Sequence, residues 1–162
     1  MATVWTERDF DRLSWHDCHI RRIDLVAGDA DEGDRTSDLA LGLDVIVEWL
    51  CGVGGGAQSW IAPATLVFHG VTDPRIAIDW GHACGQVALH PVSIDRIQRE
   101  RLQGQKVYLG RAYYRWRIVL NWPVAGEITF GAVGFMQTLL AEPVLCGTQQ
   151  LSPRERSRLL GR

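Results

Sequence analysis

Asp38-Leu-Ala-Leu-Gly-Leu-Asp-Val-Ile-Val-Glu-Trp-Leu50 is the stretch of sequence that decides the fold. Every second position from residue 39 onward is Leu, Val or Trp, ending in Val47 and Trp49, and the positions between include the carboxylates of Asp44 and Glu48. Alternation with period two is typical of a β-strand that has one face on the core and one partly in water, which favours antiparallel pairing. We therefore expect the Leu, Val and Trp side chains in the core and the two carboxylates on a solvated face.

The same alternation recurs along the chain and predicts further strands near residues 18–26, 60–70, 75–80, 114–122 and 128–132. Pro63 cannot donate a hydrogen bond, so its strand is expected to start at an edge or after the proline. The segment 87–103 fits either a strand or a short helix over its second half. The sequence predicts one α+β domain over residues 1–162, with about six to eight predominantly antiparallel strands and short terminal helices.

Two hairpins follow from matching the apolar faces of these strands. The first joins 60–70 to 75–80. In the second, Trp122 lies opposite Ile128, and Gly126 provides the left-handed residue of a three-residue loop.

Capping residues mark a helix near each end of the chain. Thr6 is suited to cap a short helix near the N-terminus. Near the C-terminus, Ser152, Pro153 and Glu155 form a capping box with proline at the first helical position, and Gly161 supplies a stop.

The composition predicts a cytoplasmic protein with no membrane association. The N-terminal residues lack the basic and apolar segments of a secretory signal, and no apolar run reaches the roughly 18 residues of a membrane helix. Residues 1–90 carry 14 acidic and 6 basic groups, and residues 91–162 carry 5 acidic and 11 basic groups. This asymmetry could steer a charged partner, although mutual neutralisation of the two halves in the fold is the favoured alternative.

Potential ligands and catalytic groups concentrate in the segment Trp15-His-Asp-Cys-His19. His16 and Cys18, together with His82 and Cys84, could supply a tetrahedral zinc site, but neither pair has the spacing of a zinc-binding loop. A cysteine nucleophile would need an oxyanion-binding motif, and none follows Cys18 or Cys84. The alternative is a strand entry, in which Trp15 closes a helix–sheet junction and His16 or Asp17 satisfies exposed backbone groups.

Arg115 and Arg117 form a second candidate surface, since they share one strand face with Tyr113. That arrangement is compatible with nucleic acid, but the net charge of −2 and the lack of a recognition motif favour pairing with cross-strand carboxylates. Of the seven tryptophans, Trp49, Trp116 and Trp122 are expected in the core. Several tryptophans exposed together would instead mark a protein-binding patch.

Two motifs carry a family resemblance. Ser14-Trp-His-Asp17 and Ile61-Ala-Pro-Ala-Thr-Leu-Val-Phe68 resemble segments of a family of small bacterial proteins of unknown function. Proteins of this size and strand content are also similar in general type to the immunity proteins of bacterial toxin systems. The second resemblance implies a protein partner.

These observations favour a non-enzymatic cytoplasmic binding protein that needs no cofactor and recognises another protein, with its oligomeric state left open. The candidate binding residues are Trp15, His16, Asp17, His19, Arg115 and Arg117. The alternative is a small metal-dependent or cysteine-based enzyme that uses His16, Cys18 and His19 together with His82 and Cys84.

Overall fold

The fold is built around β3 (Ser37–Cys51) and β4 (Ala57–His69), which pair antiparallel along almost their whole length. The computed structural model describes residues 3–29, 31–34, 36–51, 57–80, 91–103, 111–121 and 124–161. Within these residues the other strands are β1 (Val4–Thr6), β2 (His19–Ala27), β5 (Thr72–Asp79), β6 (Val92–Arg101), β7 (Tyr114–Leu120), β8 (Ala125–Ala132), β9 (Gly134–Leu139) and β10 (Val144–Cys146). The helices are the 3-10 helix η1 (Glu7–Arg12) and α1 (Pro153–Leu159).

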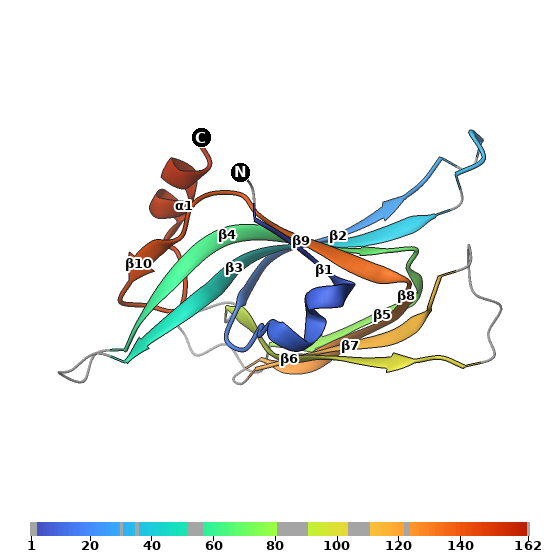
Figure 1. Ribbon diagram of the computed structural model, residues 1–162, viewed down its shortest axis with the longest axis horizontal. Helices are drawn as coiled ribbons and strands as arrows, with labels where there is room; N and C mark the ends of the chain where they lie inside the picture. Colours follow the sequence, from blue (N-terminus) through green and yellow to red (C-terminus); the bar gives the residue numbers. More distant parts are fainter. Residues whose placement is uncertain are drawn as a thin grey trace.

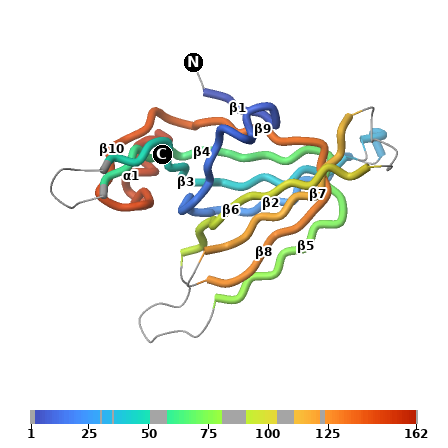
Figure 2. Tube along the Cα trace, turned by 60° about the horizontal axis from the view of Figure 1, so that its bottom comes forward, coloured from blue at the N-terminus to red at the C-terminus, as the bar shows by residue number. Residues whose placement is uncertain are grey.

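The strands pair in the order β1-β9-β4-β3-β2-β6-β7-β8-β5, and β10 also pairs with β4. All of these pairings are antiparallel. The sheet doubles over, so that β1, β9, β4, β3 and β2 form one layer and β6, β7, β8 and β5 form the other (Figure 1). Figure 2 shows the same two layers from a second direction. The sheet passes from one layer to the other at the β2–β6 pair, and the chain crosses between the layers from β4 into β5 and from β8 into β9.

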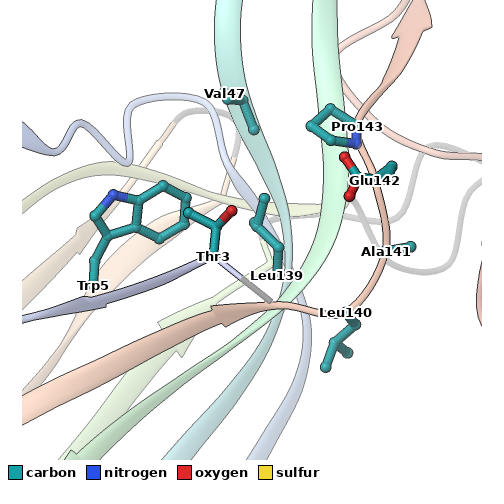
Figure 3. Close-up of a pocket in the computed structure, with 8 residues that line it drawn as sticks. All are labelled: Thr3, Trp5, Val47, Leu139, Leu140, Ala141, Glu142 and Pro143. Atoms are coloured by element: carbon teal, nitrogen blue, oxygen red, sulfur yellow. The ribbon is translucent and has the colours of Figure 1, made fainter. Parts of the chain in front are cut away.

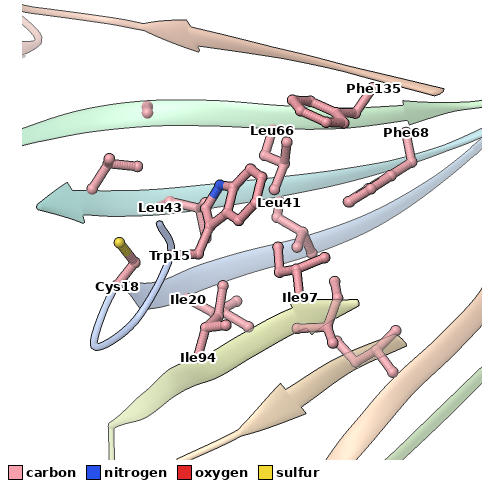
Figure 4. Packing of buried hydrophobic residues seen from close by; sticks show 14 of the residues in the cluster. Trp15, Cys18, Ile20, Leu41, Leu43, Leu66, Phe68, Ile94, Ile97 and Phe135 are labelled. Carbon is pink, nitrogen blue, oxygen red and sulfur yellow. The ribbon is translucent and has the colours of Figure 1, made fainter. Parts of the chain in front are cut away.

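The core fills the space between the two layers (Figure 4). Its centre is a set of aromatic rings whose centroids lie 5.0 to 6.4 Å apart, contributed by Phe10, Trp15, Phe68, Trp116 and Phe135. Tilted and edge-to-face pairs of this kind stabilise by about 0.5–1.5 kcal/mol each beyond the area they bury. The burial of Trp116 is as the alternation of its strand predicts.

Helix η1 closes the opening between the layers. Phe10 points into the aromatic cluster, and the guanidinium of Arg99 on β6 lies 4.2 Å from the centroid of its ring. Arg99 also donates to the carbonyl of Glu7 at 2.9 Å, so one side chain of β6 binds both the backbone of the helix and the ring of Phe10.

The prediction of a predominantly antiparallel β protein with terminal helices is confirmed, but the number of strands is larger than predicted. The described residues contain ten strands rather than six to eight. Thr6 and Ser152 both begin capping boxes, as the sequence indicates. The ambiguous segment is the strand β6 from residue 92 onward, and the helix alternative is wrong there. Residues 87–90 lie outside the described part.

The predicted hairpin between residues 60–70 and 75–80 is wrong. β4 pairs with β3 and β9, whereas β5 crosses to the other layer and pairs with β8. Gly70 and Asp73 both have left-handed backbones, with φ of 63° and 51°, and they redirect the chain between the layers. Apolar alternation alone could not distinguish these partners, because every strand offers a similar face.

The β7–β8 hairpin forms with the predicted faces but a different register. Ile118, rather than Trp122, lies opposite Ile128, so the connection is longer than three residues. Trp122 lies outside the described residues. Gly126 belongs to β8, with φ of 144°, and a Cβ there would lie 2.1 Å from the carbonyl oxygen of Ala77. Glycine is therefore needed for the close approach of β5, not for the turn.

Pro63 lies inside β4, so the prediction that its strand starts at an edge or after the proline is wrong. β3 pairs along one side of the proline. On the other side β9 ends and β10 has yet to begin, and the amide of Leu140 donates to the Pro63 carbonyl at 2.8 Å. The missing proline N–H thus coincides with the interruption at residues 140–143.

The alternation of β3 holds only as far as Val45. The register against β4 shifts between Ile46 and Glu48, which makes Val47 the extra residue of a β-bulge. Val47 and Trp49 are then 44% and 43% exposed, so the prediction that both lie in the core is wrong. The physical reason is that this end of β3 and β4 projects beyond the opposite layer, as both general views show (Figures 1 and 2).

Candidate functional site

The Trp15 side chain lies in the core rather than on a surface. It is almost fully buried, packs against Phe135, and donates from Nε1 to the side-chain oxygen of Gln137 at 2.7 Å. Because Gln137 is itself buried, this hydrogen bond satisfies two polar groups at once. Trp15, one of the predicted binding residues, therefore joins η1 to β9 through its contacts with Phe10, Phe135 and Gln137.

Cys18 and His16 point to different environments. The free thiol of Cys18 is fully buried, accepts the amide of Ile46 at 3.4 Å, and has its pKa raised by burial to about 12. His16 has a largely exposed side chain, and its Nδ1 lies 2.9 Å from the carbonyl oxygen of Asp95. No group of three or more His, Cys, Asp or Glu side chains is arranged to hold a metal among the described residues. His82 and Cys84 lie outside them.

Asp17 shapes the turn that joins the two layers. Its backbone is left-handed, with φ of 63°, and its amide donates to the Ile94 carbonyl at 2.8 Å. Its carboxylate accepts from the side-chain amide of Asn121 at 2.6 Å, at the end of β7. Asp17 thus binds β2 to β6 and β7, which is an architectural role.

His19 follows at the start of β2 and is half-buried. Its Nδ1 atom is inaccessible to water and has no hydrogen-bond partner within the described part of the chain. Burial, and to a smaller extent the neighbouring Arg21 guanidinium, lowers its pKa below the ordinary value of 6.5. The side chain is therefore neutral at physiological pH.

The two arginines of β7 have separate surroundings. Arg117 donates to the Glu127 carboxylate across the β7–β8 pair at 2.6 Å, as the cross-strand interpretation predicts. Arg115 lies exposed beside a small cavity of about 160 Å³ that Tyr113 and Asp73 also line. Tyr113 is buried, so the three side chains do not form one continuous contact face.

Asp44 is fully buried, so the prediction that it lies on a solvated face is wrong. Its carboxylate accepts from Arg21 at 2.9 and 3.0 Å and from Arg156 at 2.6 and 3.0 Å. The amide of Leu151 donates to it at 3.1 Å. Two guanidinium groups and one amide compensate the burial of this charge and bind α1 to the sheet. The sequence carries no local signal for this cluster, because Arg156 comes from a helix far along the chain.

A groove that the sequence does not predict lies where β3 projects beyond the opposite layer. It consists of two neighbouring cavities of about 530 and 240 Å³, both lined by Trp5 and Val47. Figure 3 shows the larger one, whose other lining residues include Leu139, Leu140 and Glu142. The smaller one is lined by Arg12, His16, Glu48, Trp49 and Gln137, among others. We refer to the two cavities together as the Trp5 groove.

Each wall of the Trp5 groove has a structural cause. Trp5 comes from β1, which pairs with β9 and places Trp5 opposite Gln137. Trp49 follows the bulge of β3, and Glu142 lies in the interruption that faces Pro63. The features of the sequence that could have indicated this groove are Pro63 and the number of tryptophans. Only the bulge explains why Trp49 is not in the core.

Comparisons with protein-family models, with curated proteins and with solved structures give no match for this chain. The resemblance to a family of small bacterial proteins therefore stays a prediction. Within the described residues, no helix is long and apolar enough to cross a membrane.

Proposed function

We propose that this chain is a non-enzymatic binding protein whose partner, another protein, docks on the Trp5 groove. The observation that carries the proposal is the exposure of Val47 and Trp49, together with Leu140 at 48%, around two neighbouring cavities. Large apolar side chains that gather at a concave surface are typical of protein-binding sites.

The kind of residue in the groove supports this function. Tryptophan is the residue most enriched among those that dominate binding energy, and it acts best in a pocket that excludes water. Here Trp5 and Trp49 line one cavity, and polar and charged residues are also part of its lining. Protein interfaces usually combine a hydrophobic centre with polar residues around it.

An immunity protein is the concrete form of this proposal. The general resemblance in size and strand content supports it, and so does the lining of the groove, where the two glutamates Glu48 and Glu142 outnumber the one arginine, Arg12. Such a protein neutralises a toxin domain encoded beside it, and the partner is then a cytotoxic enzyme with a basic surface.

The test is binding between this chain and the domain encoded next to its gene, measured by titration calorimetry with and without Trp49→Glu. We expect the substitution to weaken binding by about 30-fold or more, the effect of losing a dominant interface residue. When each variant is co-expressed with the toxic domain, Trp49→Glu should fail to protect the cells.

The matched control is Leu25→Glu, which alters another exposed apolar residue, 56% exposed, on β2 outside the groove. We expect this variant to bind as the wild type does. Equal binding by both variants, with unchanged melting temperatures, would contradict the groove as the binding site. Absence of binding by the wild-type chain would contradict the immunity form.

A further inference from the structure

The smaller cavity of the Trp5 groove has the chemistry of a cation site. Its lining residues include two tryptophans, Trp5 and Trp49, and one glutamate, Glu48. The electron-rich face of an indole attracts a cation more strongly than that of any other side chain, and a nearby carboxylate adds a direct charge. An aliphatic occupant would use the indoles but leave the carboxylate unpaired.

The basic side chains already present on this wall lie beside carboxylates of their own. The Arg12 guanidinium lies 4.0 Å from the Asp9 carboxylate. The His16 ring lies 3.6 Å from carboxylate oxygens of both Asp17 and Asp95. Among the described residues, Glu48 makes no ion pair. The negative charge left over in the cavity is therefore that of Glu48.

The size of the cavity indicates a single side chain. Its volume of about 240 Å³ is below the roughly 300–1,000 Å³ of sites that enclose small-molecule ligands. A guanidinium is planar, stacks on aromatic rings and binds a carboxylate through two parallel hydrogen bonds, whereas an ammonium does so through one. Arginine thus matches both the indoles and the carboxylate.

We propose that this cavity receives an arginine side chain of the partner protein, stacked on Trp5 and Trp49 and paired with Glu48. The proposal rests on the proposed function and adds the chemistry of the partner. The larger cavity next to it, lined by Leu140 and Val47, then takes a neighbouring apolar residue of the same partner segment.

The test uses the acetylated tripeptide amide Gly-Arg-Gly and its citrulline counterpart, which has the same shape without the charge. Protein with ¹⁵N-labelled tryptophan reports binding through the indole N–H signals, and Trp5→Phe and Trp49→Phe assign two of them. We expect the arginine peptide to shift both signals with a dissociation constant of millimolar order, and the citrulline peptide to bind about tenfold more weakly.

Glu48→Gln should weaken binding of the arginine peptide by about five- to tenfold. Glu100→Gln makes an equal change of charge on the exposed part of β6, and it should leave this binding unchanged. Equal shifts with the arginine and citrulline peptides, or no shift, would overturn the cation site. If Trp49→Glu still abolished binding of the protein partner in that case, the proposed function would stand without this inference. If neither experiment showed binding, both would fall.

Discussion

Cys18 acts on the backbone rather than as a reactive group. Its sulfur accepts the amide of Ile46, the last residue before the bulge of β3. A bulge leaves one backbone group without its ladder partner, and a buried amide without a partner costs about 1–3 kcal/mol. The thiol therefore stabilises the irregularity that exposes Trp49.

The thiol pKa gives a direct prediction. In a variant with Cys18 as the only cysteine, the rate of alkylation by iodoacetamide should keep rising through pH 10, because the thiolate is the nucleophile and the pKa is raised to about 12. The same variant unfolded in urea should level off near pH 9. A plateau near pH 9 in the folded protein would show an accessible, ordinary thiol.

His19 makes the stability of the protein depend on pH. Its pKa in the folded state is lowered by burial, so the unfolded chain binds a proton more readily than the folded one. The free energy of unfolding should therefore fall as pH drops below 6.5, and His19→Gln should reduce this slope between pH 7 and 5. Urea titrations at several pH values measure the free energy of unfolding and hence this slope. A difference between variant and wild type that did not change with pH would contradict the prediction.

At the scale of elements, α1 depends on the sheet for its stability. An isolated helix of seven residues does not form in water, because nucleation costs more than so few hydrogen bonds return. Arg156 of α1 donates to the Asp44 carboxylate and to the Leu151 carbonyl, at 2.6 and 2.8 Å from Nη2. The buried carboxylate therefore organises the helix and the residues that precede it.

Asp44→Ala should destabilise the protein by about 3–5 kcal/mol, since it leaves two guanidinium groups without their shared partner. Asp24→Ala is the matched control, because Asp24 pairs with Arg22 at 2.6 Å on the exposed part of β2. That surface pair should contribute below about 1 kcal/mol. Urea unfolding measures both, and similar losses for the two variants would contradict a special role for Asp44.

For the whole molecule, the sequence predicted most of the strands but not β1, β9 or β10, and it predicted the pairing of β7 with β8 but not the partners of β4 and β5. Alternation is a local property, so β2, β3 and β7 could be recognised from their own residues. Pairing is not local: β5 pairs with β8, and β1 with β9. The register of β7 and β8 also escaped prediction, because a shift of four residues keeps every apolar side chain on the same face.

The candidate site escaped prediction for the same reason. The predicted residues Trp15 and Asp17 are polar or aromatic because they join the layers. The Trp5 groove requires three distant features, namely an edge strand, a bulge and the interruption opposite Pro63. No single segment reveals their meeting.

The charge asymmetry of the sequence is partly resolved within the fold. Asp11 pairs with Arg99 at 3.7 Å and Asp44 with Arg156 at 2.6 Å, so each pair joins the acidic half to the basic half. This agrees with the interpretation that the halves neutralise each other.

The position of β1 has a consequence for biosynthesis. Among the described strands β1 pairs only with β9, although many elements separate the two along the chain. Trp5 can take its place only after residues 134–139 have left the ribosome and formed their own strand. The groove is therefore assembled late, and a partner that docks there, as proposed, cannot bind a nascent chain before nearly all of these elements have been made.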